Sequence, residues 1–355
     1  MGKTRPARPD KNMYTIKQKS EDFIVKEISA IIPLEQGRYS YFLLKKEQRN
    51  TLDVVKEISR RLNIREKQIG FAGSKDKHGI TEQVISVTGV SRERILSLKL
   101  ENVNLRFLGY GNSPLSLGEL AGNSFEIVVR NLPKELLREE IVVSPYLENY
   151  FDEQRFSSHN VLVGKALLLK DFAEAIKHIN KEECEQHLQD HPADYVGALR
   201  LLPIRLLRMY INAFQSSLWN KTSAEYLKRN NPAGKAVPFS QGELFFVEQP
   251  ERWKELNIPL VGFGEIVTED QQILEIIERL LQEENITRSN FIIKQIPEIT
   301  VEGELRSAVV EVDDIAVGDV EDDELNLGMK KVQVKFTLPK GSYATMVIKR
   351  IFAGV

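Results

Sequence analysis

Residues 71–83 have the sequence FAGSKDKHGITEQ, in which Asp76 stands between two lysines. The small and charged residues at its centre predict a polar loop over residues 74–79, between a short apolar run and a following strand. Such a loop presents the Asp76 carboxylate, and the neighbouring lysines favour its ionised form, which can act as a nucleophile or a base. A polar surface turn without chemistry has a similar composition, so the residues alone leave both interpretations open.

Strands and a helix are expected on both sides of this loop. Residues 39–45 (YSYFLLK) and 83–87 predict strands, and Asn50 can cap a helix whose apolar residues recur at helical spacing. Residues 103–108 predict a further strand. Residues 124–130 (SFEIVVR) alternate between apolar and polar side chains, which is typical of a strand with one buried face.

The pattern changes near residue 146. Residues 146–302 carry apolar side chains mainly at helical spacing. The strongest helix candidates are residues 163–179, 206–228 and 271–284. Strand patterns return over residues 307–312 and 331–338, separated by an acidic loop that we expect to be solvated. A helix over residues 343–352 is expected to pack its apolar side on a sheet.

The two ends of the chain therefore share a strand-rich pattern, and a more helical segment interrupts it. This organisation predicts the α+β fold class. We expect residues 1–145 and 304–355 to form one domain, and residues 146–303 to form a second domain inserted into it.

Composition excludes several classes of protein. The chain has 355 residues, of which 42% are hydrophobic, enough for one large core or two moderate ones. No stretch approaches the roughly 18 consecutive apolar residues of a membrane span, and residues 1–11 are basic without the apolar segment of a signal peptide. We expect no membrane association and a cytoplasmic location. The single cysteine, Cys184, cannot form an internal disulfide, which fits a reducing compartment.

The net charge of −2 hides an asymmetry along the chain. Residues 1–100 contain 21 lysines and arginines against 12 acidic residues, whereas the rest contains 28 against 39. A cationic segment of this kind attracts the phosphates of a nucleic acid whatever the remainder carries. A solvated basic surface without a partner would have the same composition.

A metal site is a competing possibility. Cys184, His187 and His191 recur at helical spacing, which would place three potential zinc ligands along one helix face. Such a site needs a fourth ligand from elsewhere, and the intervening residues are those of a solvated helix. The pattern therefore favours a helix without a metal site.

The segment FAGSKDKHGITEQ resembles the signature of the TruD family of tRNA pseudouridine synthases. Further segments resemble the motifs of that family in the same order along the chain. They are Lys17 with SEDFIV (residues 20–25), GNSF (122–125), NYF with QRF (149–151 and 154–156) and LPKGSYAT (338–345), with a looser match over residues 208–220. The chain departs from the family at Asp152, where many members have glycine, and at His159 and Asn160. These departures concern the RNA contacts of the inserted domain.

The resemblance implies a fold and an activity. It implies a pseudouridine-synthase-like mixed antiparallel sheet with helices, in a catalytic domain split by an α/β insertion, the TRUD domain. The implied reaction isomerises uridine to pseudouridine in tRNA, usually at position 13, and in some members in other RNAs. It needs no cofactor, no metal and no obligatory protein partner. A non-catalytic RNA-binding or RNA-folding protein on the same fold is the alternative.

The resemblance also implies roles for five residues. Asp76 is the catalytic carboxylate, which attacks the sugar or the base, or assists glycal formation. Lys17 pairs with Asp76, and Asn123 orders the loop beside the base. Phe125 stacks on the target uracil, which must leave its helical stack, and Phe23 packs nearby. Periodicity alone would assign both phenylalanines to the core.

Overall fold

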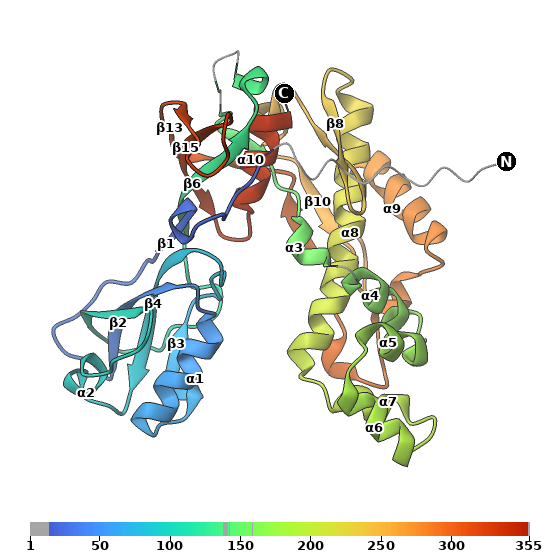
Figure 1. Ribbon diagram of the computed structural model, residues 1–355. Helices are drawn as coiled ribbons and strands as arrows, with labels where there is room; N and C mark the ends of the chain where they lie inside the picture. The colour runs from blue at the N-terminus through green and yellow to red at the C-terminus, as the bar shows by residue number, and fades with distance from the viewer. Residues whose placement is uncertain (1–13, 138–140, 142, 158, 354–355) are drawn as a thin grey trace. The chain divides into compact units, whose positions relative to one another are not determined.

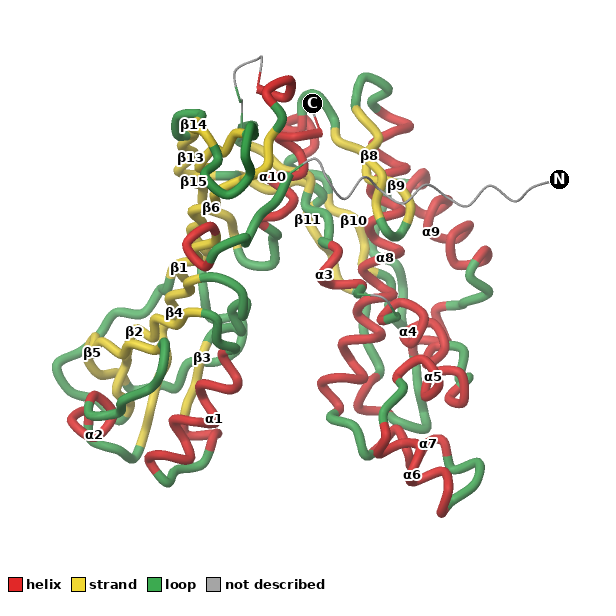
Figure 2. Tube along the Cα trace, viewed as in Figure 1, coloured by secondary structure: helices red, strands yellow, loops and turns green. Residues whose placement is uncertain are grey.

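The computed structural model describes residues 14–137, 141, 143–157 and 159–353, so the basic segment over residues 1–11 lies outside the described residues. The chain divides into two compact units. Unit 1 comprises Met1–Pro145 and Glu311–Ala344, and unit 2 comprises Tyr146–Val310 and Thr345–Val355. Unit 1 is built mainly of strands and unit 2 mainly of helices (Figures 1 and 2). The predicted α+β class is confirmed.

Unit 1 is organised around one mixed sheet. Its strands follow the order β13 (Asp313–Val317), β15 (Lys330–Pro339), β6 (Gly122–Leu132), β1 (Phe23–Ile28), β4 (Ile80–Thr88), β2 (Tyr39–Glu47) and β5 (Val103–Gly111). Two short strands join this path, because β14 (Glu321–Asp322) pairs with β15 and β3 (Ile69–Phe71) pairs with β4. Strands β1 and β4 are parallel, and the other neighbours are antiparallel. The sheet therefore joins both ends of the chain through β6 and β15.

The alternation of side chains along the strands gives this sheet a buried face. Phe125, Ile127 and Val129 of β6 are buried, as are Phe23 and Val25 of the neighbouring β1. Helix α1 (Thr51–Leu62) packs its apolar residues on β2, β3 and β4. Its N-terminus is capped as predicted, because Oδ1 of Asn50 accepts a hydrogen bond from the backbone N–H of Leu52 at 3.3 Å. A second helix of the unit, α2, spans Arg92–Leu96.

Strand β1 was missed by the sequence analysis, although it lies in the middle of the sheet. Its six residues, FIVKEI, carry two charged side chains at positions 26 and 27, which weakens the apolar signal. The local sequence of β1 does not reveal its neighbours, which are β4 on one side and β6 on the other. Central strands are favoured by such neighbours more than by intrinsic propensity.

The acidic loop after β13 was predicted to be solvated, and for Asp323 this is wrong. Asp323 is buried, and its Oδ1 lies 3.0 Å from Nη1 of Arg130. Burial opposes ionisation of Asp323, but the N–H group of Asn131 and further donors, including Arg130, outweigh it and lower the pKa of Asp323 to about 2. Arg130 also contacts Asp22, with 2.9 Å between Nη2 and Oδ1, so one arginine links the strand β6 to two buried carboxylates.

Unit 2 is built around a long helix, α8 (Ile204–Asn230). The other helices are α3 (Glu153–Phe156), α4 (Asn160–Leu168), α5 (Phe172–Ile179), α6 (Glu182–Asp190), α7 (Tyr195–Arg200), α9 (Gln271–Glu283) and α10 (Ala344–Ala353), the last beginning at the end of unit 1. Short two-stranded sheets pair β8 (Lys235–Phe239) with β9 (Gly242–Phe246), β10 (Asn257–Leu260) with β11 (Glu304–Ser307), and β7 (Tyr146–Glu148) with β12 (Val309–Glu311).

The single helix predicted over residues 163–179 is two helices in the structure. Lys170 adopts a left-handed backbone conformation with φ 63°, which ends α4. The carboxylate of Asp171 then accepts a hydrogen bond from the backbone N–H of Glu174 at 3.0 Å and starts α5. The apolar spacing continues across this break, so periodicity alone did not detect it.

The last helix is tied to unit 2 by a buried ion pair. Nη1 of Arg350 lies 2.7 Å from Oε1 of Glu148, and Nη2 of Arg350 donates to the backbone carbonyl of Val247 at 2.8 Å. Burial raises the pKa of the Glu148 carboxyl, while the charge of Arg350 opposes that rise. The chain passes between the units after residues 145, 310 and 344, whereas the boundaries expected from the sequence lie after residues 145 and 303. Among the helices of the described residues, none is long and apolar enough to span a membrane.

Candidate active site

The loop that carries Asp76 leaves β3 and enters β4, and side chains from three elements hold its backbone. Nε2 of Gln83 donates to the carbonyl of Gly73 at 2.9 Å. The backbone N–H of Lys75 donates to Oγ1 of Thr51, the first residue of α1, at 3.0 Å. Nζ of Lys46 donates to the carbonyl of Asp76 itself at 2.8 Å. The loop is therefore anchored at Asp76 and at two residues before it, as preorganised catalysis requires.

The carboxylate of Asp76 is partly exposed and paired. Nζ of Lys17 donates to its Oδ2 at 2.6 Å, with the two side chains 16% and 41% exposed for Lys17 and Asp76. The same ammonium lies 4.0 Å from the centre of the Phe23 ring, on whose face a cation is attracted. The predicted partners Lys17, Phe23 and Asp76 are thus brought together in the structure.

Three phenylalanines from adjacent strands form a cluster beside this pair. Phe125 meets Phe23 edge to face, with ring centres 6.4 Å apart, and stacks on Phe336 at 5.5 Å. Phe336 lies opposite Phe125 in the pairing of β15 with β6. Only 7% of Phe125 is exposed. The core packing that periodicity favoured for Phe23 and Phe125 is therefore present, and stacking of Phe125 on a uracil stays a prediction.

Lys75 makes two further contacts, with Asn123 and with Glu27, and it is more buried than the Lys17–Asp76 pair. Nζ of Lys75 donates to Oδ1 of Asn123 at 2.7 Å and lies 2.9 Å from Oε2 of Glu27. The side chains of Lys75 and Glu27 are 7% and 1% exposed. Among the described residues, no donor meets hydrogen-bond geometry at Oε2 of Glu27, so charge rather than an aligned hydrogen bond joins it to Lys75. Asn123 thus connects to the Asp76 loop through Lys75.

Three further residues of this site, Lys75, Glu27 and Lys46, are not predicted from the sequence. From the sequence, Lys75 is expected only to favour an ionised Asp76, and Glu27 lies in β1, a strand that the sequence patterns do not predict. Lys46 is buried, although its neighbour Lys45 is exposed. The alternation of a strand over residues 39–47 could have revealed it, because Phe42, Leu44 and Lys46 share one face. His78, in contrast, is exposed, as a histidine in a polar loop usually is.

The geometry does not support the zinc alternative. Among the described residues, no group of three His, Cys, Asp or Glu side chains is arranged to hold a metal ion. Sγ of Cys184 is buried and lies 3.5 Å from the carbonyl oxygen of Ala198, while Nε2 of His187 lies 2.9 Å from Oδ2 of Asp194. Cys184 and His187 therefore have different partners, and the rings of His187 and His191 lie 4.8 Å apart, centre to centre.

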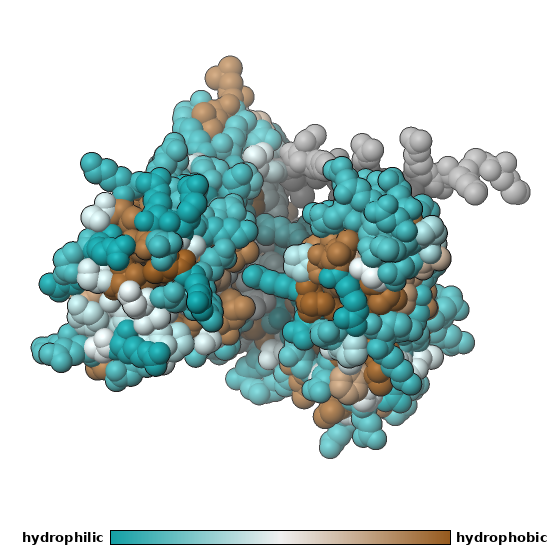
Figure 3. Space-filling view, turned by 90° about the horizontal axis from the view of Figure 1, so that it is seen from below, coloured by the Kyte–Doolittle hydropathy of each residue, from teal (hydrophilic) through white to brown (hydrophobic). Residues whose placement is uncertain are grey.

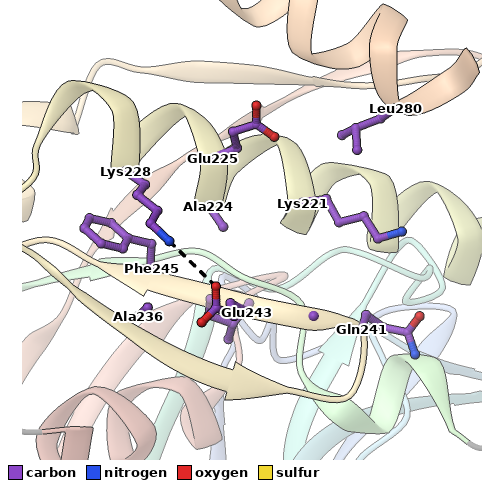
Figure 4. Close-up of a pocket in the computed structure, with 11 residues that line it drawn as sticks. Lys221, Ala224, Glu225, Lys228, Ala236, Gln241, Glu243, Phe245 and Leu280 are labelled. Carbon is purple, nitrogen blue, oxygen red and sulfur yellow. Dashed lines mark ion pairs between the residues drawn. The ribbon is translucent and has the colours of Figure 1, made fainter. Parts of the chain in front are cut away.

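Unit 2 contains a cavity of about 330 Å³ between α8, the β8–β9 hairpin and α9 (Figure 4). Its lining combines apolar side chains, such as Phe245 and Leu280, with Lys221, Lys228, Glu225 and Glu243. The two lysines are paired with glutamates, Lys228 with Glu243 at 3.7 Å and Lys221 with Glu284 at 3.0 Å. None of the five site residues predicted from the sequence lines this cavity.

In the part of the chain that the structure describes, exposed apolar side chains do not form a second site. Ile32, Leu117 and Leu327 are strongly exposed in unit 1, as are Leu201 and Val267 in unit 2. The face drawn in Figure 3 shows hydrophobic residues in separate patches among hydrophilic ones on each unit. Scattered exposure of this kind is ordinary for protein surfaces. The exposed apolar residues therefore do not indicate a site that competes with the groups around Asp76.

Comparison with known proteins gives one consistent result. The family model for tRNA pseudouridine synthase D (TruD) matches residues 10–186 and 180–351. The tRNA pseudouridine synthase D of Aquifex aeolicus is 33% identical over 384 aligned positions, which cover 95% of this chain and 97% of the relative. A Methanosarcina mazei protein described as a probable tRNA pseudouridine synthase D is 30% identical, and the match covers 94% of this chain and 92% of the relative. A crystal structure of a protein so assigned from Methanosarcina mazei matches 98% of this chain and 95% of its own, with a TM-score of 0.69 and 28% identity.

Proposed function

Because the chain belongs to the TruD family of tRNA pseudouridine synthases, we propose that it isomerises uridine 13 of tRNA, with the Asp76 carboxylate starting the reaction. The activity itself follows from the family, since relatives that match almost the whole chain are tRNA pseudouridine synthases, which are isomerases. The position in tRNA and the role of Asp76 are the parts that we propose.

The observation that carries the proposal is the pair formed by Lys17 and Asp76, with 2.6 Å between Nζ and Oδ2. The two residues come from separate motifs, and the contact leaves 41% of the Asp76 side chain exposed. An ionised carboxylate that is held by one cation and still accessible can act on a substrate as a nucleophile or a base. The anchored loop backbone restricts its direction.

The reaction matches the groups at this site. The bond between N1 of uracil and C1′ of ribose breaks, the uracil turns, and a bond forms between C5 and C1′. The proton on C5 is lost and N1 gains a proton, so no electrons are taken up or released. A carboxylate can serve each of the routes left open above, namely attack on the sugar, attack on the base, or assistance to glycal formation.

We further propose that the base lies beside Phe125, with Asn123 ordering the neighbouring loop. A uridine within a stacked RNA must leave its stack before a carboxylate can reach C1′, and an aromatic side chain can replace part of the lost stacking. The contact from Lys75 to Asn123 connects that position to the Asp76 loop. Use of other RNAs, a cytoplasmic location and the absence of an obligatory protein partner stay predictions.

Tritium release tests this proposal directly. Unmodified tRNA labelled with tritium at C5 of uridine is incubated with the full chain without added cofactor, and the product site is then mapped. We expect release of one label per tRNA and pseudouridine at position 13. Modification only at another position would contradict the proposed target, and absence of release from any RNA would contradict the activity.

A further inference from the structure

We propose that Lys46 is a positioning residue for Asp76: its buried ammonium holds the carbonyl groups on both sides of the Asp76 Cα and so sets the direction of the carboxylate. This inference rests on the proposed role of Asp76 in the reaction. It concerns a residue of β2 that belongs to none of the motifs discussed above.

The contacts of Lys46 surround the loop at its functional residue. Nζ donates to the carbonyl of Asp76 at 2.8 Å, to that of Lys75 at 3.3 Å and to that of Arg49 at 2.7 Å. An ammonium has three N–H donors, so all of them are used. Two of the three acceptors belong to consecutive peptide groups of the loop.

Those two peptide groups determine the conformation of Asp76. The carbonyl of Lys75 belongs to the peptide plane before the Asp76 Cα, and the carbonyl of Asp76 belongs to the plane after it. Because peptide units are planar, holding both planes restricts φ and ψ of Asp76 and therefore the direction of its Cα–Cβ bond. A shift of about 1 Å in a reacting group can cost on the order of a hundredfold in rate.

The position of Lys46 makes a purely packing role a poor explanation. It lies on the face of β2 that also carries Phe42 and Leu44, and only 1% of the residue is exposed. Burying an ammonium costs free energy unless polar partners compensate, and an apolar side chain would fill such a position without that cost. The compensation here comes from the carbonyl groups of the Asp76 loop and the segment before α1.

The charges around Lys46 make the proposal testable by pH. Burial lowers the pKa of Lys46 to about 8, with the charge of Asp76 opposing the decrease and the charge of Lys75 adding to it. Lys75 is paired with Glu27, and Asp76 with Lys17. Above that pKa the neutral amine has two N–H donors for three carbonyls and no longer places a positive charge beneath the loop.

The experiment compares single-turnover rates and tRNA affinity in Lys46→Met, Lys46→Arg and the control Lys45→Met between pH 6.5 and 9. Lys45 is adjacent, but its side chain is 53% exposed and lies 3.4 Å from Glu82, so the control removes a lysine without touching the loop. We expect Lys46→Met to lower the rate at least about tenfold with little change in affinity. The wild type and Lys45→Met should lose rate as pH rises through about 8, and Lys46→Met should lack that decline.

Several results would overturn the proposal. Lys46→Met with the wild-type rate would do so, as would a decline with pH that persists unchanged in Lys46→Met, since that decline would then come from the RNA or from another residue. If Lys46→Met does not fold, Lys46→Arg decides, because its guanidinium stays charged and should remove the decline near pH 8. Asp76→Asn, measured in parallel, distinguishes a failure of the role proposed for Asp76 from a failure of the role proposed for Lys46. An active Asp76→Asn would remove the assignment of Asp76, whereas an inactive Asp76→Asn with a fully active Lys46→Met would remove only the role of Lys46.

Discussion

The ammonium of Lys17 lies 2.6 Å from Oδ2 of Asp76, although 59 positions separate the two residues in the sequence. The topology of the sheet explains this contact. Lys17 precedes β1 and Asp76 precedes β4, and β1 and β4 are parallel neighbours in which Ile24 lies opposite Ile80. Segments that lead into two neighbouring parallel strands lie close together, because both strands begin at the same end of the sheet. The ion pair is therefore a consequence of one strand pairing.

Asp76→Asn should abolish turnover and leave the fold and the tRNA affinity largely unchanged. The substitution keeps the size of the side chain and an oxygen that Lys17 can reach, but it removes the negative charge that starts the reaction. Single-turnover tritium release and a binding titration on the same preparation measure both properties. Residual activity within about tenfold of the wild type would contradict the assignment of Asp76.

Lys17→Ala should act mainly on the chemical step. It removes the only ion pair in which Asp76 takes part among the described residues, and with it the contact of the ammonium with the Phe23 ring. We expect a fall of about 10- to 100-fold in the single-turnover rate at saturating tRNA. Lys19→Ala is the matched control, because Lys19 is exposed and pairs with Glu324 at 3.1 Å. Equal effects of the two substitutions would mean that Lys17 only adds positive charge.

Phe125 needs two substitutions, because its ring packs between Phe23 and Phe336. Phe125→Ala should cost about 3–5 kcal/mol of stability, as is usual for a truncated core aromatic residue. Phe125→Leu keeps most of the apolar volume and should cost less than about 1.5 kcal/mol, while it removes the aromatic face. Thermal unfolding measures the stability of both variants. If Phe125→Leu retains the wild-type rate at saturating tRNA, the aromatic ring has only a packing role.

Gly73 and Gly79 both lie in the loop that carries Asp76, but substitution by alanine should change the stability of the protein differently at the two positions. Gly79 has φ +131°, and a Cβ there would lie 2.4 Å from the carbonyl oxygen of Phe23. Gly79→Ala should therefore disturb the start of the β1–β4 pairing, cost about 1–3 kcal/mol and lower the rate. Gly73 has an ordinary φ and open space around a Cβ, so Gly73→Ala should stay within about 0.5 kcal/mol of the wild type. Equal stability losses in the two variants would contradict this account.

The affinity for tRNA should fall steeply with salt. The first hundred residues carry 21 basic against 12 acidic residues, and phosphate contacts release counterions when they form. Stacking on one flipped base contributes only about 1–3 kcal/mol, so most of the affinity should come from charge. Binding titrations at several salt concentrations test this prediction, with Asp76→Asn expected to show the same slope. A flat salt dependence would show that the basic segment does not bind the RNA.

Local patterns in the sequence determined many of the elements and the motif that carries the chemistry. The alternation over residues 124–130 predicted a strand with one buried face, and Asn50 marked the start of α1 because capping depends on residues within one turn. The segment around Asp76 identified the family, which the comparisons confirm. The roles of Asp76, Lys17, Phe23, Asn123 and Phe125 in the reaction stay predictions, although the structure brings these residues together.

Only the tertiary structure decided which groups surround Asp76. Lys45 and Lys46 are chemically identical neighbours, but the strand places Lys45 in solvent and Lys46 beneath the Asp76 loop. The sequence places Asp323 in an acidic run that is expected to be solvated, but in the structure Asp323 is buried and paired with Arg130 of β6. In each case the deciding partner lies far away in the sequence, where local periodicity carries no information. Burial and ion pairing depend on which strands become neighbours, and that is a property of the whole sheet.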